Sequence, residues 1–95
     1  MKIAELRAGM RRVDLTGEVV SVEQSREVMT KFGPAQVANA TLQDESGSVR
    51  ITLWNENVGK VTVGATVAIE NGYVDSFRGE LQLSAGRYGR MTIIE

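Results

Sequence analysis

The only tryptophan of the chain ends a stretch of alternating side chains, residues 48–54, which reads Ser-Val-Arg-Ile-Thr-Leu-Trp. A period of two predicts a strand in which Arg50, Thr52 and Trp54 share one face, while Leu53 and the other aliphatic residues share the opposite face. An indole ring next to a guanidinium group is suited to stacking against an unpaired nucleobase. The structural alternative is that Trp54 closes one end of the fold or packs under a loop, and this stretch alone does not decide between the two.

The amino-acid composition excludes most catalytic chemistry. The chain has 95 residues, of which 42% are hydrophobic, and this predicts a single domain spanning residues 1–95. It contains no cysteine and no histidine, so cysteine nucleophiles, thiolate metal sites and the commonest general base are missing. Asp44 and Glu45 are adjacent carboxylates, but they begin a turn and have no partner for acid–base chemistry. We therefore expect no enzymatic activity, no catalytic residue, no cofactor, no metal site and no small-molecule substrate.

Hydropathy and net charge further restrict the possible partners of the protein. The apolar runs are only a few residues long, which predicts a cytoplasmic protein with neither a transmembrane helix, a signal peptide nor a membrane partner. Eleven Lys and Arg residues against twelve Asp and Glu residues give a net charge of −1, which is not the charge of a protein that binds mainly by phosphate attraction. A nucleic acid would have to be held by stacking, at roughly 1–3 kcal/mol per stacked base.

The elements before the tryptophan strand indicate a small barrel. From Val13 the apolar alternation continues to Val19, then shifts by one residue close to Gly17, as in a β-bulge or a sharply bent strand. A long bent strand that serves two sheets is typical of the first strand of such a barrel. Residues 23–36 show little periodicity and are predicted to be a long hairpin loop. Phe32, beside Lys31, could contact a ligand, but we favour a role in pinning the loop to the barrel.

The elements around and after the tryptophan strand complete an all-β pattern. Residues 38–43 alternate as a strand whose polar face carries Asn39 and Thr41, and the turn at residues 44–47 leads into the tryptophan strand. A short helical connector follows Asn55, and Arg78-Gly79 forms a tight turn between two further strands. The total is five strands with a short helix between the third and the fourth.

This order is the layout of the oligonucleotide-binding (OB) fold, a five-stranded barrel whose second and third strands form its usual ligand face. Five motifs in the same order strongly resemble the single-barrel single-stranded DNA-binding proteins of archaea, at residues 3–10, 42–47, 53–54, 69–73 and 77–87. The related human single-barrel DNA-damage sensor proteins and domains of archaeal replication protein A are similar as well. The resemblance extends over nearly the whole chain.

The resemblance implies a set of binding residues. Base-stacking rings are expected at Trp54, Tyr73 and Phe77, and phosphate contacts at Arg50, Arg78 and Arg87. The polar side chains expected to follow the nucleic-acid backbone are Asn39, Thr41 and Thr52, with Lys31 and Phe32 as further candidates. Ser84 occupies a position where some members carry another aromatic residue, so one stacking platform is expected to be missing.

The function implied by the resemblance is single-stranded DNA binding in replication, recombination or repair, with other replication or repair proteins as further partners. Two alternatives stay open. The barrel could be a protein–protein interaction module in which the same aromatic residues form a hot spot, or it could bind single-stranded RNA. Many members of the family continue into a glycine-rich or acidic tail. For this sequence, which ends at Glu95, we therefore expect either that such a tail has been cut away or that the chain is one domain of a multi-barrel protein.

Overall fold

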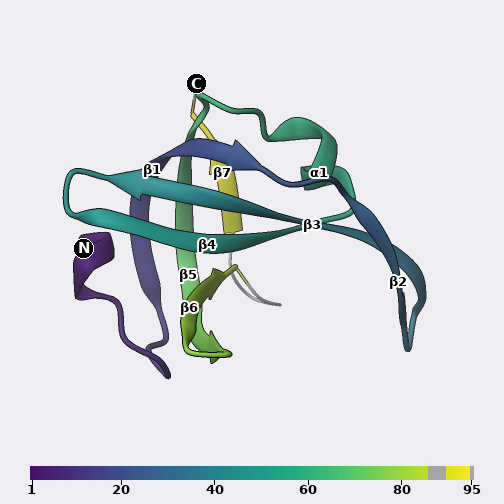
Figure 1. Ribbon diagram of the computed structural model, residues 1–95, viewed down its shortest axis with the longest axis horizontal. Helices are drawn as coiled ribbons and strands as arrows, with labels where there is room; N and C mark the ends of the chain where they lie inside the picture. The colour runs from purple at the N-terminus through teal and green to yellow at the C-terminus, as the bar shows by residue number, and fades with distance from the viewer. Residues whose placement is uncertain (86–89, 95) are drawn as a thin grey trace.

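A computed structural model describes residues 1–85 and 90–94. The described chain is an all-β structure with one short 3₁₀ helix and one short α-helix (Figure 1). Its elements, in chain order, are η1 (Ile3–Glu5), β1 (Val13–Val22), β2 (Arg26–Thr30), β3 (Gly33–Asp44), β4 (Gly47–Trp54), α1 (Glu56–Lys60), β5 (Thr66–Phe77), β6 (Glu80–Ser84) and β7 (Arg90–Ile93). The prediction of five strands was therefore too low, because β2 and β7 are additional strands in the described part of the chain.

The strands form one strongly curved sheet. Their order is β1-β3-β4-β6-β5-β7, β2 pairs with β3, and β1 also pairs with β5. The path β1-β3-β4-β6-β5 consequently returns to the strand from which it starts. All pairings are antiparallel except that of β4 with β6. In Figure 1 the long β3–β4 ribbon crosses β5 at a steep angle, and α1 follows the end of β4.

The bend predicted in the first strand is confirmed. The first half of β1 pairs with β5 and the second half pairs with β3, with an irregular register between Val19 and Ser21. Gly17 lies where β1 passes from one partner to the other. A Cβ atom at Gly17 would lie 2.8 Å from the Leu42 side chain and 2.9 Å from the Gln43 carbonyl oxygen. Glycine is needed here because the neighbouring strand approaches too closely for a larger residue.

The inward face of the sheet forms the hydrophobic core. On β4 the buried side chains are those predicted by the alternation, and Leu53 is fully buried at 0% exposure. Across the core they meet apolar residues of the neighbouring strands, including Leu42, Ile69 and Leu83. The opposite face of β4 is consequently free to carry side chains that do not stabilise the core.

Residues 23–36 are not the loop that the sequence predicted. β2 pairs with the first part of β3 from Arg26–Val37 to Thr30–Gly33, and this two-stranded arm projects from the body of the molecule at the right of Figure 1. The Thr30 hydroxyl donates to the Gly33 carbonyl at 2.7 Å and accepts from the Phe32 amide at 3.1 Å, which builds the tip. The sequence shows no alternation here because neither face of β2 is fully buried.

The β3–β4 turn anchors the N-terminal segment through one carboxylate. Asp44 Oδ1 accepts hydrogen bonds from the Ser46 hydroxyl and amide and from the Gly47 amide, and Oδ2 accepts one from the Ile3 amide at 2.8 Å. These bonds favour the charged form. The Ser46 hydroxyl and then the Ile3 amide are the main causes that lower the pKa of Asp44 from its ordinary value of 3.8 to about 2.

This lowered pKa predicts an acid-dependent loss of stability. Because the pKa of Asp44 is lower in the folded state than in the unfolded state, its contribution is complete above pH 3.8 and is lost as the pH falls towards 2. Asp44→Asn should therefore unfold at lower urea concentration than the parent at pH 6, and the two midpoints should converge near pH 2. Urea unfolding followed by circular dichroism measures this difference, and a difference that stays constant with pH would contradict it.

Candidate nucleic-acid interface

The outward face of β4 carries the residues with which the sequence analysis began. Directly opposite them on β3, the register places Thr41 beside Arg50, Asn39 beside Thr52 and Val37 beside Trp54. Opposed residues of an antiparallel pair share a face of the sheet. Trp54 is 43% exposed, whereas Val37 is buried. The indole therefore lies beside a buried apolar residue and keeps a large exposed surface, as base stacking requires, while its choice between a stacking and a structural role stays a prediction.

The same face continues across β6 and β5. Gln82 lies beside Arg50 in the parallel pairing of β4 with β6, and the β5–β6 hairpin pairs Tyr73 with Ser84 and Phe77 with Glu80. Tyr73 is 44% exposed and Phe77 is 59% exposed, while Val74 and its cross-strand partner Leu83 are buried. Three partly exposed aromatic rings therefore stand on one outer surface.

The turn between β5 and β6 fixes this register. Arg78 and Gly79 both have positive φ, at 52° and 82°, as in the two-residue type I′ turn that matches the twist of a hairpin. The turn places Phe77 directly opposite Glu80. The Arg78 guanidinium lies 5.3 Å from the centre of the Phe77 ring, within the range of a cation–π contact. Arg78 is thus held beside an aromatic ring at the edge of the face.

The tip of the β2–β3 arm adds a fourth ring near Trp54. Phe32 is 86% exposed, so the expectation that it pins the arm to the body is wrong. Phe32 and Trp54 instead line one hollow of about 380 Å³ between the arm and the end of β4. Asn55, which also lines this hollow, links the end of β4 to the arm. Its backbone amide donates to the Gln36 carbonyl at 2.8 Å, and its side-chain Oδ1 accepts from the Gln36 backbone amide at 3.1 Å. Lys31 Nζ lies 5.2 Å from the centre of the Phe32 ring.

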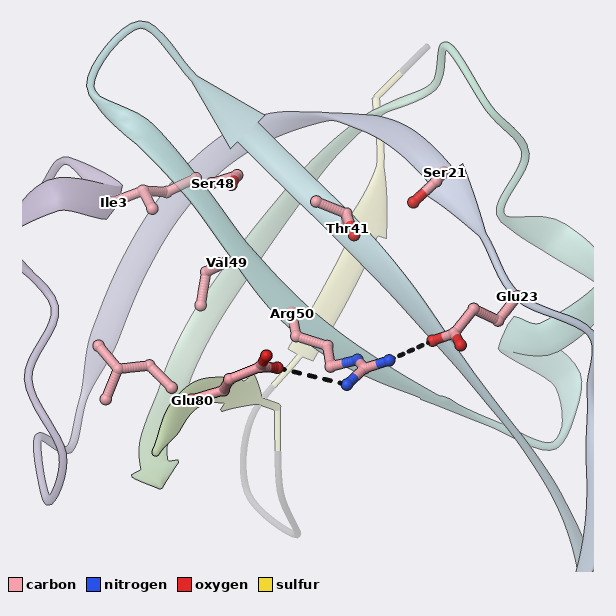
Figure 2. A pocket seen from close by; sticks show the side chains of 9 residues that line it. Ile3, Ser21, Glu23, Thr41, Ser48, Val49, Arg50 and Glu80 are labelled. Carbon is pink, nitrogen blue, oxygen red and sulfur yellow. Dashed lines mark hydrogen bonds and ion pairs between the residues drawn. The ribbon is translucent and has the colours of Figure 1, made fainter. Parts of the chain in front are cut away.

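Arg50 is the cation at the middle of the face, and it is already paired. Its Nη2 donates to Glu23 Oε2 at 2.7 Å and its Nη1 lies 3.5 Å from Glu80 Oε2 (Figure 2). The hydrogen bond and charge of Glu23, and then the charge of Glu80, raise the pKa of Arg50 above its ordinary value. The resemblance placed Arg50 as a phosphate ligand, but in this structure two carboxylates surround its charge.

The sequence analysis did not single out either glutamate. The Glu23 amide donates to the Asn39 carbonyl at 2.8 Å, so the backbone beyond β1 stays beside β3 and brings Glu23 to the face. Glu80 could have been found, because a two-residue turn at Arg78-Gly79 pairs Phe77 with the residue that follows the turn. The position predicted at Arg87 lies outside the described residues.

Two other kinds of feature are absent from residues 1–85 and 90–94. None of the helices in that part of the chain is long and apolar enough to cross a bilayer. The same residues contain no group of three or more Asp, Glu, His or Cys side chains that could hold a metal ion.

Comparison with known families agrees with this geometry. Residues 6–93 match the family model "Single-stranded DNA binding protein Ssb-like, OB fold". The chain belongs to this Ssb-like OB-fold family. In OB folds the ligand face lies on the second and third strands of the barrel, flanked by loops. In this Ssb-like chain the paired strands β3 and β4 carry Asn39, Thr41, Arg50, Thr52 and Trp54.

Individual relatives support the same assignment. The Ssb-like chain is 35% identical over 85 residues to the single-stranded DNA binding protein Ssb of Saccharolobus solfataricus, covering 90% of this chain and 57% of that protein. It is 34% identical over 91 residues to replication factor A of Methanothermobacter thermautotrophicus, covering 95% of this chain and 12% of that protein. The chain thus spans only part of the length of these relatives.

A solved structure shows the same arrangement of strands. The second OB-fold domain of replication protein A from Methanococcus maripaludis is 32% identical, with a TM-score of 0.78, and the comparison covers 100% of this chain and 94% of that domain. The likeness therefore covers the whole of this chain and nearly all of that domain.

Proposed function

We propose that this Ssb-like domain binds single-stranded DNA by stacking unpaired bases on Trp54, Tyr73 and Phe77. The observation that carries the proposal is the presence of these three partly exposed rings on one outer face, although each could have been buried on the other side of its strand. Membership of the Ssb-like family supports the choice of ligand. Every base has a face on which to stack, so this mode of binding tolerates many sequences.

The remaining candidate residues lie in different surroundings, which support different roles in binding. Phe32 shares a hollow with Trp54 and would take the other side of a base inserted there. Asn39, Thr41 and Thr52 supply polar groups between the aromatic residues, for hydrogen bonds to the sugar–phosphate backbone. Arg78 and Lys31, each beside an exposed ring, are placed to neutralise the phosphates of a stacked nucleotide. Arg87 would extend this set.

We also infer that β1, β3, β4, β5 and β6 are the five strands of the OB barrel, with α1 between its third and fourth strands, and that β2 and β7 extend it. The proposed activity is binding without catalysis. Relatives named single-stranded DNA binding protein and replication factor A support a role in DNA replication, recombination or repair. Other proteins of these processes are the further partners that we propose.

The proposal is tested by comparing single-stranded and double-stranded ligands. Fluorescence anisotropy of labelled oligothymidine, titrated with the purified 95-residue chain, should show saturable binding, whereas a duplex of the same length should bind much more weakly because its bases are not free to stack. An RNA oligouridine in the same experiment distinguishes the RNA alternative. Equal affinity for the single strand and the duplex would exclude the stacking proposal.

The salt dependence of the same titration reports how much of the affinity is electrostatic. Arg50 is neutralised by Glu23 and Glu80, so few cations of the described face remain for phosphates. If two or three phosphates are neutralised, the slope of log K against log salt should be roughly −1.5 to −2, at about −0.7 per phosphate on a single strand. A slope several units steeper would mean that phosphate attraction dominates over stacking.

A further inference from the structure

A cavity of about 560 Å³ opens beside Arg50, with a volume typical of ligand sites (Figure 2). Part of its lining is apolar and is formed by Ile3, Val49 and Leu81. The remainder is polar and includes Glu23, Arg50 and Glu80 together with three hydroxyl side chains. An apolar surface beside a small set of charged groups suits a flat organic ring whose edge carries hydrogen-bonding groups.

The charge of this cavity excludes a phosphate group as its occupant. Two carboxylates surround one guanidinium group, so the local formal charge is −1 and a phosphate would be repelled. The contacts with Arg50 use Oε2 of each glutamate, so Oε1 of each remains available as an acceptor. Arg50 has five N–H groups, of which these contacts use only part. The cavity thus offers carboxylate acceptors beside a guanidinium donor.

The cavity also lies where a bound strand would pass. Glu80 is the cross-strand partner of Phe77, and Thr41 is the cross-strand partner of Arg50. A single strand that stacks on Phe77 therefore brings a neighbouring base to the mouth of the cavity. This step rests on the proposed function, because it assumes that the strand binds on the same face.

We propose that this cavity is a base-reading subsite that selects guanine in single-stranded DNA. The Watson–Crick edge of guanine carries one acceptor, O6, followed by two donors, N1–H and the N2 amino group. Arg50 would donate to O6 while Glu23 or Glu80 accepts from N1 and N2, so one arginine–glutamate pair matches the whole edge. Thymine has a single N–H between two carbonyl oxygens, which a carboxylate repels. Adenine and cytosine each lack one of guanine's two adjacent donors.

The competing explanation is that the three charged side chains form an ordinary surface ion pair. Exposed ion pairs contribute little to stability, and the side chains of Glu23 and Glu80 are more than half exposed. Such a pair would have no preference for one base over another. Base discrimination therefore separates the two explanations, whereas protein stability does not.

The test is a scan of oligothymidines in which one thymine is replaced by guanine at each position in turn. At the position that reaches the cavity, guanine should strengthen binding about tenfold, which is the discrimination expected of one good bidentate contact. Inosine, which lacks the N2 amino group but stacks as a purine, should lose most of this gain at the same position. Adenine should give little gain, because it stacks as a purine but lacks one of guanine's two adjacent donors.

Matched variants assign the effect to the cavity. Glu23→Gln and Glu80→Gln keep the side-chain shape but remove the charge, and together they should reduce the guanine gain to about twofold or less, since the charge-assisted bonds are lost. Glu70→Gln makes the same charge change on an exposed position of β5 outside the cavity lining, and it should retain the full gain. Urea unfolding verifies that the variants fold equally well.

Two results would overturn the subsite: no position at which guanine improves binding, or a guanine gain that is the same in the double variant as in the parent. Both can be observed while plain oligothymidine still binds, in which case the stacking proposal stands and only the subsite fails. If oligothymidine itself does not bind, the proposed function has failed and the subsite fails with it.

Discussion

Trp54→Ala is expected to weaken binding to oligothymidine by about 1–3 kcal/mol, which is roughly tenfold or more, because it removes one stacking platform. The same change should cost only about 1 kcal/mol or less in the free energy of unfolding, as for other surface substitutions. The physical reason is the position of the ring on the outer face of β4, where 43% of the residue is exposed. Anisotropy titrations and urea unfolding of the same preparation measure both quantities.

Trp54→Phe is the matched control for this experiment. Phenylalanine keeps an aromatic face over Val37, so most of the binding should return. Phe32→Ala tests the same hollow from the tip of the arm, and it should also weaken binding because Phe32 would take the other side of a base inserted there. A Trp54→Ala protein that unfolds much more easily than the parent, yet binds normally while folded, would show that the indole is structural.

Leu53→Ala, one residue earlier on the same strand, is expected to have the opposite profile. Leu53 is fully buried at 0% exposure in the core cluster, so truncation loses transfer free energy and leaves a cavity. Substitutions of this kind cost about 2–5 kcal/mol in the free energy of unfolding, which is a large share of the roughly 5–15 kcal/mol that stabilises a typical domain. The variant should bind oligothymidine nearly as well as the parent under conditions where it remains folded.

Val63→Ala is the matched control for Leu53→Ala. It also truncates an aliphatic side chain, but Val63 is largely exposed, so the free energy of unfolding should change by no more than about 0.5 kcal/mol. Urea unfolding at fixed pH compares the two variants directly. Equal midpoints for Leu53→Ala and the parent would mean that the inward face of β4 is not the core.

The Leu53→Ala and Trp54→Ala variants also test how the side chains of β4 are divided between its two faces. The alternation of residues 48–54 predicted that Leu53 and Trp54 point in opposite directions, and their exposures confirm it. The shift of phase near Gly17 likewise predicted the bend in β1 that joins β5 to β3. These features follow from local periodicity, because a strand with one buried face records its orientation in its own sequence.

Other features leave no periodic pattern in the sequence, and these features were not predicted. Residues 23–36 were expected to be a loop, since β2 gains its partner only from β3 and buries neither face. Phe32 was expected to pack against the body, but the arm carries it outward to share a hollow with Trp54. An element that is stabilised by pairing and not by burial leaves no hydrophobic period to detect.

The outer face likewise has features that the sequence determined and features that only the tertiary structure decided. The sequence by itself determined which side of β4 carries Trp54, because burial of the alternate residues leaves the ring no other face, whereas Tyr73 and Phe77 were assigned to the ligand face only by the resemblance. Only the tertiary structure decided the state of Arg50, since Glu23 and Glu80 lie 27 residues before it and 30 after it in the chain. Charges that far apart in sequence meet only where the curved sheet brings their strands together, so local spacing carries no record of the pairing.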